Sequence, residues 1–271
     1  MTEPGRRRWA RAYARLRRTE GRGVGGEREL AALPYLTSGP LAAQWRIRAR
    51  TFDAFLRRVV SPLEEERGRP LRVLDLGAGN GWLSARLSAR GHRCVAADLR
   101  LDDVDGLAAT APFASRLGRM FGRVAASFDA LPLPAGLIDL VVFDASLHLA
   151  EDLGRVLVEA ARAAAPGGRV AILDSPFYAR AESGHAMRAE KRRETAARYA
   201  DLAGDLLALA PVEFLTKARL DEAGARAGLR FRRRRVLYPF AYEARGVVAR
   251  FRGAREPSRF DLWVARAGSA P

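Results

Sequence analysis

Three glycines at alternate positions are the residues whose spacing most directly suggests chemistry. The stretch LRVLDLGAGNG, residues 71–81, predicts a buried strand that breaks into a loop carrying Gly77, Gly79 and Gly81. Glycine has no side chain, so this loop would let a ligand approach the backbone closely. Asp98 ends the next apolar run, where its carboxylate could hold a ribose diol. Together these residues predict a site for a nucleoside-containing cofactor.

The loop departs from the dinucleotide-binding fingerprint. That fingerprint is G-x-G-x-x-G, and Trp82 stands where its third glycine would be. The chain instead has Asp75 two positions before the first glycine, followed by glycines at alternate positions. This pattern resembles motif I of the class I S-adenosylmethionine-dependent methyltransferases.

The resemblance continues beyond the loop, in the order and spacing of that family. Asp98 matches the acid at the end of the second strand, and residues 128–130, FDA, match the acidic loop on the adenine side. Residues 139–148, DLVVFDASLH, match the fourth-strand motif, and residues 166–168, PGG, match the turn into the fifth strand. The matching positions extend over residues 71–174.

The resemblance implies that the cofactor is S-adenosylmethionine and assigns part of it to each motif. Asp75 would orient the loop and accept from the methionine ammonium, while Asp98 would accept from both diol hydroxyls. Asp129 would accept from the adenine amine, with Ala130 donating from its backbone and Leu99 beside the ring. The cofactor-binding residues predicted from these motifs are Asp75, Gly77, Ala78, Gly79, Gly81, Asp98, Leu99, Asp129, Ala130 and Asp144.

The segment before the first strand is expected to contribute a lid. In the resembling family a helix there often folds over the cofactor, so Trp45 would shield its methionine end and Arg46 would meet its carboxylate. The apolar residues around Trp45 recur at three- and four-residue spacings. That spacing supports a second interpretation, in which Trp45 belongs to the buried face of an ordinary helix.

The methyl acceptor should lie beyond the carboxyl ends of the strands, where ligands bind in open parallel sheets. His148 is a candidate general base because its ordinary pKa lies near neutrality. Alternatively, His148 starts the next helix or packs beneath the cofactor. Methyl transfer is an in-line displacement at an activated sulfonium, so positioning alone can supply much of the acceleration. The residues predicted to line the substrate pocket are Tyr35, Ser146, Phe177 and Tyr178.

Alternating strand and helix patterns carry these motifs. Helical patterns span 82–90, 104–117, 153–165 and 216–227, and strand patterns span 73–76, 94–97, 123–126, 138–143, 169–173, 231–238 and 260–265. Apolar strands separated by helices indicate an α/β fold whose parallel sheet is covered on both faces. We expect a Rossmann-like, doubly wound, seven-stranded, mostly parallel sheet with a reversed last strand and a helical cap.

The domain organisation follows from the same patterns. Residues 1–70 are interpreted as an N-terminal helical segment or cap, within which residues 40–66 have helical spacing. Residues 71–271 form the methyltransferase core that the resemblance implies. Within that core, residues 176–215 lack a strand pattern and are expected to form a helical insertion.

Composition narrows the choice of partners. The 271 residues carry a formal net charge of +16, but the arginines that dominate it are spread along the whole chain. We attribute this charge to compositional bias, because a nucleic-acid partner requires a clustered basic face. Residues 6–18 and 230–235 are the candidates for such a face. The sequence does not specify an oligomeric state.

Cysteine and hydropathy point to the compartment. Cys94 is the single cysteine, so no intrachain disulfide can form, and no Cys/His cluster has metal-binding spacing. We therefore predict no metal and a reducing, cytoplasmic location. No run approaches the roughly 18–20 apolar residues of a membrane helix, and no transmembrane segment is predicted.

These expectations converge on a methyltransferase that uses S-adenosylmethionine to methylate a small molecule. The enclosed cap and the lack of a separate RNA-binding module favour that acceptor class. One alternative is an RNA or protein methyltransferase that uses the arginine-rich surface. Another is a cofactor-binding regulatory protein without transfer activity.

Overall fold

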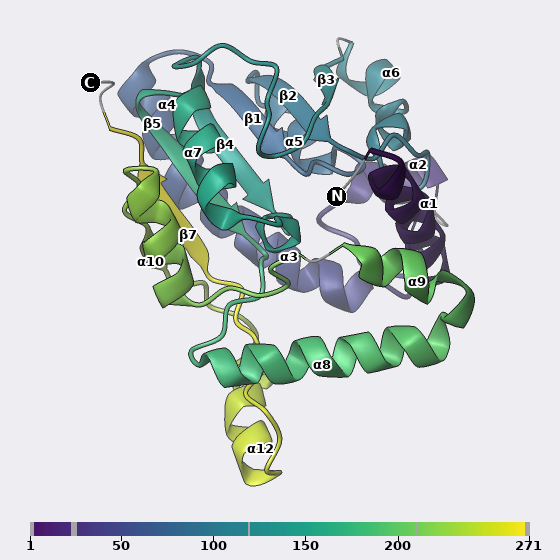
Figure 1. Ribbon diagram of the computed structural model, residues 1–271. Coiled ribbons are helices and arrows are strands. Elements are labelled where there is room, and N and C mark those ends of the chain that lie inside the picture. The colour runs from purple at the N-terminus through teal and green to yellow at the C-terminus, as the bar shows by residue number, and fades with distance from the viewer. Residues whose placement is uncertain (1–2, 23–25, 119, 210, 269–271) are drawn as a thin grey trace.

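The computed structural model describes residues 3–22, 26–118, 120–209 and 211–268. A seven-stranded sheet in the order β3-β2-β1-β4-β5-β7-β6 forms its centre (Figure 1). The first five strands pair in parallel, and β7 is antiparallel to both β5 and β6. The strands are β1 (Arg72–Leu76), β2 (Arg93–Asp98), β3 (Gly122–Ala125), β4 (Ile138–Asp144), β5 (Ala164–Leu173), β6 (Arg232–Arg234) and β7 (Leu262–Arg266). This arrangement confirms the predicted fold class.

Both faces of the sheet are buried, because the central strands carry apolar side chains on alternate sides. Leu74 and Phe143 point into one core, and Val73 and Val142 point into the other. The first core is covered by α7 (Leu153–Ala163) and α10 (Lys217–Arg226). The second is covered by α3 (Ala42–Phe55), α4 (Ser61–Arg67) and α5 (Trp82–Ala89), with a π-helical turn at Leu56–Val60.

The N-terminal segment serves two different layers. Helices α3 and α4 coincide with the predicted helical stretch 40–66, apart from Arg67 at the end of α4, and pack on the sheet itself. Helix α1 (Glu3–Thr19) instead lies against α9 (Ala200–Ala208), near the carboxyl ends of the strands. The short helix α2 (Gly26–Ala32) follows α1.

Residues 176–215, predicted as a helical insertion, include two helices. These are α8 (Ala181–Arg198) and α9, which run along one side of the molecule (Figure 1). Two further short helices, α11 (Phe240–Glu243) and α12 (Arg245–Phe251), fill the connection between β6 and β7. Among the described residues no helix is long and apolar enough to cross a membrane.

Two predicted elements were too long. The helix expected at 104–117 is a 3₁₀ turn, Leu107–Thr110, followed by α6 (Phe113–Leu117). Pro112 separates the two pieces because its ring cannot continue a helical hydrogen-bond ladder. The strand expected at 231–238 pairs only over β6, since the amide of Val236 donates to the Asp261 carboxylate instead of to a strand (3.0 Å).

Candidate functional site

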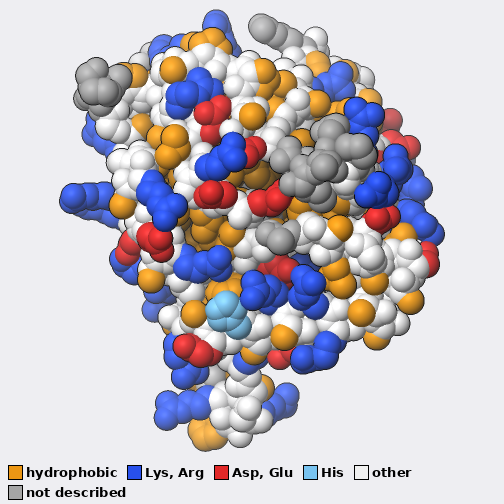
Figure 2. All heavy atoms as spheres, in the orientation of Figure 1, with side chains coloured by type: hydrophobic (Ala, Val, Ile, Leu, Met, Phe, Trp, Pro, Cys, Tyr) orange, Lys and Arg blue, Asp and Glu red, His pale blue; other side chains and the backbone are white. Residues whose placement is uncertain are grey.

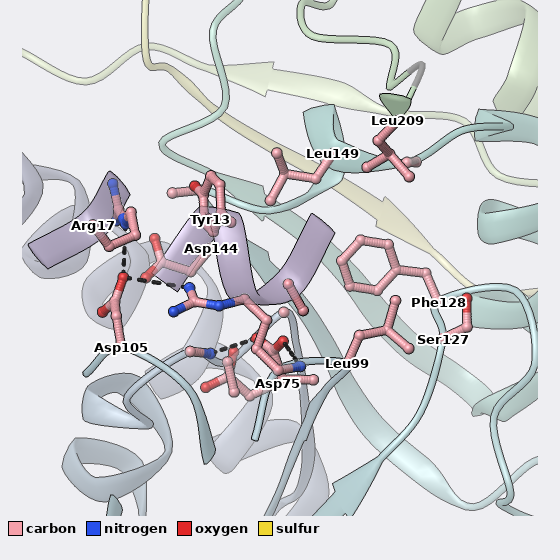
Figure 3. Close-up of a pocket in the computed structure, with 18 of the residues that line it drawn as sticks. Tyr13, Arg17, Asp75, Leu99, Asp105, Ser127, Phe128, Asp144, Leu149 and Leu209 are labelled. Carbon is pink, nitrogen blue, oxygen red and sulfur yellow. Dashed lines mark hydrogen bonds and ion pairs between the residues drawn. The ribbon is translucent and has the colours of Figure 1, made fainter. Parts of the chain in front are cut away.

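A cavity of about 350 Å³ opens at the carboxyl ends of β1, β2 and β4, where the strand order changes direction. This is the place where open α/β sheets bind ligands. The glycine loop, Asp75 and Asp98 line one side, which we call the floor. Helix α1 crosses the opposite side, which we call the roof, with Tyr13 and Arg17 (Figure 3). Trp9 of the same helix also lines the cavity.

The floor depends on two glycines. Gly77 and Gly79 both have positive φ angles, 74° and 54°, in the region that residues with a Cβ rarely adopt. A Cβ on Gly77 would also collide with the side chain of Ser146. Both glycines line the cavity, together with Ala78. The loop therefore brings bare backbone against whatever fills the site.

Gly81 of the same loop allows the turn into α5 and does not face the cavity. It precedes the first turn of α5 with a φ of 71°, and a Cβ there would strike the side chain of Thr110. Gly81 is not among the lining residues. The structure thus separates it from the cavity, although the sequence placed it with the other two glycines.

Asp98 ends β2 with its carboxylate held in position. One oxygen accepts from the amide of Gly79 and the other from the amide of Arg100, both at 2.8 Å. An ionised carboxylate has about four acceptor positions, so both oxygens retain capacity for a ligand. Burial is the main cause that raises the pKa of Asp98. Leu99, which follows it, is 45% exposed and lines the cavity.

Asp75 lies deeper in the floor and is 1% exposed. Its carboxylate accepts from the Ser84 hydroxyl at 2.9 Å. Burial, followed by the charge of Asp144, raises the pKa of Asp75 to about 7. A cationic ligand group beside Asp75 would favour the ionised form that burial disfavours.

The loop after β3 forms a third wall. Ser127, Phe128 and Asp129 line the cavity, and the Ser127 hydroxyl donates to Asp129 at 2.6 Å. Ala130 is exposed and does not line it, and its amide donates to the Ser127 carbonyl at 3.3 Å. The predicted backbone contact from Ala130 is therefore not in place.

Arg48 of α3 joins two acidic residues that end neighbouring strands. It donates from Nη2 to Asp144 at 2.6 Å and from Nε to Asp174 at 3.1 Å. Its guanidinium lies 4.3 Å from the ring centre of Trp45 and 5.5 Å from that of Trp82. Although burial opposes the charge, the two carboxylates raise the pKa of Arg48. Arg48, Trp45 and Asp144 all line the cavity.

The backbone around this cluster is strained. Ala145 and Asp174 have φ angles of 53° and 47°, which are uncommon for residues with a Cβ and tend to occur at functional sites. Oδ1 of Asp144 and Oδ1 of Asp174 are buried without a hydrogen-bond partner in the described residues. Burial and the charge of Asp144 raise the pKa of Asp174 to about 7.

Arg46 was predicted to meet the cofactor carboxylate, but Arg48 is the arginine of α3 that lines the cavity. Arg46 is exposed and does not line the cavity. Two residues correspond to about 200° of helical rotation, so Arg46 points away when Arg48 points in. Trp45 packs edge-on against Trp82 within the core, as the buried-face interpretation predicts, and it also lines the cavity. Its contact with the cofactor stays a prediction.

A charged latch attaches the roof to the floor. Arg17 donates from Nε to Asp105 at 2.9 Å, and Asn80 of the glycine loop donates to the other oxygen of Asp105 at 3.1 Å. Trp9 and Tyr13 stack on each other above the cavity, with ring centres 4.8 Å apart. None of the five residues named in this paragraph was predicted from the sequence. The one pattern that could have indicated them is the spacing of Trp9 and Tyr13, which lie one helical turn apart.

Arg22 is a second unpredicted cation at the cavity. It is 5% exposed, and its Nε has no hydrogen-bond partner among the residues described. Its Nη2 donates to the side chain of Gln44 at 3.0 Å. Burial and the nearby charge of Arg17 lower the pKa of Arg22 to about 10. Nothing in so arginine-rich a sequence distinguishes this residue from its neighbours.

His148 faces a different cavity. The turn after β4 puts Ala145 and Leu149 in the main cavity, whereas His148 lines a second one with Glu213 and Lys191. Burial and the charge of Lys191 hold the pKa of His148 well below its ordinary value. Its imidazole is therefore neutral and a weak base.

Three of the four residues predicted for the substrate pocket lie outside both cavities. Ser146 donates its hydroxyl to the Leu76 carbonyl at 2.5 Å, and Tyr35 donates to Asp53 at 2.8 Å while remaining 46% exposed. Phe177 is buried against Trp263 with ring centres 4.7 Å apart. Tyr178 lines the second cavity beside His148.

Comparison with known proteins identifies the central segment. Residues 74–172 match the family model described as a methyltransferase domain. A malonyl-[acyl-carrier protein] O-methyltransferase of Geobacter sulfurreducens is 36% identical over 129 residues, 47% of this chain and 47% of that protein. A ubiquinone/menaquinone biosynthesis C-methyltransferase of Methylobacterium nodulans is 31% identical over 117 residues, 43% of this chain and 46% of that protein. The chain spans about half the length of these relatives.

Solved structures share the fold at low sequence identity. A protein of Galdieria sulphuraria described as a putative sarcosine dimethylglycine methyltransferase matches with a TM-score of 0.55 and 16% identity, over 86% of this chain and 92% of that one. The YcgJ protein of Bacillus subtilis matches with a TM-score of 0.53 and 14% identity, over 74% of this chain and 93% of that one.

Proposed function

Because this chain belongs to the class I S-adenosylmethionine-dependent methyltransferase superfamily, we propose that it transfers a methyl group from that cofactor to a small-molecule acceptor. The observation that carries the proposal is the floor of the main cavity. There, two bare glycines and two fixed carboxylates converge at the carboxyl ends of the parallel strands.

The donor set of this floor fits S-adenosylmethionine. Asp98 keeps free acceptor positions suited to a ribose diol, while Asp75 supplies a buried carboxylate for the methionine ammonium. A Cβ at Gly77 would fill the space between the loop and Ser146. Phe128 and Leu99 offer apolar surface for the adenine, next to the Asp129 carboxylate.

The residues around the floor would bind, orient and exclude water. When bound, the cofactor supplies a methyl group on a positively charged sulfur. Trp9 and Tyr13 close the cavity from above, and Arg48 with Arg22 places two cations beside the Trp45 ring for a carboxylate. Because orientation supplies much of the acceleration in such displacements, the weakly basic His148 is not required as a proton acceptor.

The enclosed cavity supports a small acceptor over a large one. Helix α1 covers the floor, and the latch from Arg17 to Asp105 holds it there. The relatives named above are a malonyl-[acyl-carrier protein] O-methyltransferase and a C-methyltransferase of ubiquinone/menaquinone biosynthesis, so a malonyl thioester and a quinone-type intermediate are the first acceptors to test. We place the activity in the cytoplasm, which suits the free, buried Cys94 thiol.

Calorimetry with S-adenosylmethionine tests the cofactor site. We expect Asp98→Asn to weaken binding by about 1.5–3 kcal/mol, the scale of a hydrogen bond to a charged group. The matched control is Asp221→Asn, which removes an exposed carboxylate paired with Lys217 on α10. Equal affinity of the two variants would remove Asp98 from the site, and undetectable binding by the unmodified protein would overturn the proposal.

Methyl-labelled cofactor tests the transfer step. We expect label to appear in a malonyl thioester or a quinone-type intermediate, with turnover that changes little with salt. Tight cofactor binding without transfer to any acceptor would favour a regulatory protein. Transfer to RNA that falls steeply with salt would favour the arginine-rich surface, because each phosphate contact releases counterions.

A further inference from the structure

The connection between β6 and β7 forms a narrow projection. Its two short helices, α11 and α12, extend away from the rest of the molecule, at the bottom of Figure 1. We call residues 237–253 the hairpin. The same projection in Figure 2 carries basic side chains on both sides and a hydrophobic group at its end. No other part of the described chain packs around this end in either view.

The hairpin exposes an unusual amount of apolar surface. Among the described residues, five of the ten exposed large hydrophobic side chains lie within it. Phe240 and Phe251 are the extreme cases, at 86% and 87% exposed, and Leu237 follows at 70%. Val247 shares a helix face with Phe251, four residues later. Single exposed hydrophobic residues are ordinary, but such a group marks an interaction site.

The hairpin carries one acidic residue, Glu243, which pairs with Arg235 and Arg259 outside the hairpin, and the charges beyond it have one sign. Residues 244–255 contain four arginines and no acidic residue. Arg255 at the base is paired with Glu190, and Arg245 donates to the Ser258 carbonyl. Arg250 and Arg252 are exposed, and no acidic side chain in the part of the chain described here pairs with either one. The end of the hairpin therefore combines aromatic side chains with unneutralised cations.

We propose that the hairpin docks the protein on an anionic lipid surface. Phe240, Phe251 and Val247 would enter the boundary between headgroups and acyl chains, while Arg250 and Arg252 would meet lipid phosphates. The shape favours lipid over an acidic protein. A standard protein interface needs about 800 Å² on each partner, whereas a narrow convex end with outward aromatic side chains suits insertion into a fluid boundary.

Residues at the base of the hairpin connect the proposed lipid contact to the second cavity. Arg245, Arg255 and Ser258 line the second cavity, as His148 does. Docking would hold the mouth of that cavity near the lipid. The proposal does not rest on methyl transfer, because lipid binding can be measured without cofactor or acceptor.

Co-sedimentation of the full chain with vesicles tests the proposal. We expect strong binding to vesicles of phosphatidylcholine mixed with phosphatidylglycerol, and weaker binding to phosphatidylcholine alone. Phe251→Ser should lower partitioning about tenfold or more on both vesicle types, because a large apolar side chain is no longer buried. Arg250→Gln should lower it about fivefold on the anionic vesicles only.

Matched variants elsewhere on the surface separate docking from general stickiness. Val158→Ser removes an exposed apolar residue on α7, and Arg226→Gln removes an exposed arginine on α10. Both should bind vesicles like the unmodified protein. The proposal is overturned if the hairpin variants bind as tightly as these controls. It is also overturned if the unmodified protein ignores anionic vesicles but binds an acidic acyl-carrier protein through the same residues.

Discussion

The floor and the roof of the main cavity are built by different means. The floor consists of residues close in sequence, and backbone amides of Gly79 and Arg100 hold its Asp98 carboxylate. The roof comes from the start of the chain and is attached through Arg17 to Asp105, 88 residues later. The floor is therefore fixed by the fold of one βαβ unit, whereas the roof is held by segments distant in sequence, through the packing of α1 on α9 and the ion pair from Arg17 to Asp105.

That difference suggests a division of labour. A floor held by the backbone stays in place with or without ligand, so it can define which cofactor binds. A roof attached by a latch can open at the cost of a small number of polar contacts, so it can admit ligand and then exclude water. Arg48 lies between them, on the helix layer that supports the sheet.

The largest expected effect comes from removing the cation between floor and sheet. We expect Arg48→Met to lower the free energy of unfolding by about 3–5 kcal/mol, because it leaves the buried carboxylates of Asp144 and Asp174 unpaired. Urea unfolding measures this. The control is Arg46→Met on the exposed face of the same helix, which should change stability by less than about 0.5 kcal/mol.

Acid should partly rescue that variant. The folded-state pKa of Asp174 is already raised to about 7, above its ordinary value, by burial and by Asp144. A group whose pKa is raised on folding favours the folded protein as pH falls. The deficit of Arg48→Met should therefore shrink below pH 7, and a deficit independent of pH would show that lost packing causes it.

The second effect tests whether the floor is as rigid as its contacts suggest. Gly77→Ala combines a strained φ with a collision against Ser146, and we expect it to cost about 2–4 kcal/mol in stability and to abolish measurable cofactor binding. Gly91→Ala is the control, since Gly91 also has a positive φ of 94° but open space at its Cβ. It should cost about 1 kcal/mol and leave cofactor affinity intact. Equal losses would mean that backbone strain alone explains both.

The same contrast explains what the sequence predicts well. The floor can be predicted because Asp75, the glycine loop and Asp98 are local signals, tied to strand ends that the apolar pattern already fixes. The wrong predictions in this region concern the direction in which a residue points. Gly81 and Ser146 belong to the predicted segments, but they point toward the protein interior and not into the cavity. Asp174 could also have been predicted, because it directly follows the strand that neighbours the one ending in Asp144.

The roof could not be predicted by these means. Arg17 and Arg22 are two arginines in a chain full of arginines, and only folding shows which ones become buried. Arg46 and Arg48 differ by two positions, and a helical pattern without a known register does not say which one faces inward. His148 was assigned from its ordinary pKa, which burial among the residues of the second cavity changes.

The third effect is a pH dependence of the floor. Burial and the charge of Asp144 raise the pKa of Asp75 from 3.8 to about 7. If Asp75 receives the methionine ammonium, cofactor affinity should fall as pH drops below 7, by up to about tenfold per unit. Stability of the cofactor-free protein has the opposite sign. The folded state binds one more proton between 3.8 and about 7, so its unfolding free energy decreases as pH rises through that window.

Calorimetry and urea unfolding across this range measure the two slopes. Asp75→Asn should remove the affinity slope and reduce the stability slope, leaving the share that comes from Asp174. The variant keeps an acceptor for the Ser84 hydroxyl but carries no charge to titrate. An unchanged affinity slope in Asp75→Asn would assign the ammonium to another group. The pH dependence of the unfolding free energy would still reveal whether Asp75 titrates in the folded protein. The two measurements therefore test the pKa of Asp75 and its contact with the ammonium separately.

The smallest effect concerns the roof. Arg17→Met removes the ion pair between Arg17 and Asp105, whose side chains are 19% and 10% exposed, respectively. We expect the cofactor to dissociate about fivefold faster, with little change in stability. Arg18→Met is the matched control on the same helix. Its pair with Asp103 is 63% and 79% exposed, and such surface pairs contribute little. Stopped-flow release of the product cofactor compares the two. Equal release rates would mean that α1 is held by the packing of Trp9 and Tyr13, and that the roof, like the floor, does not depend on its charged contacts.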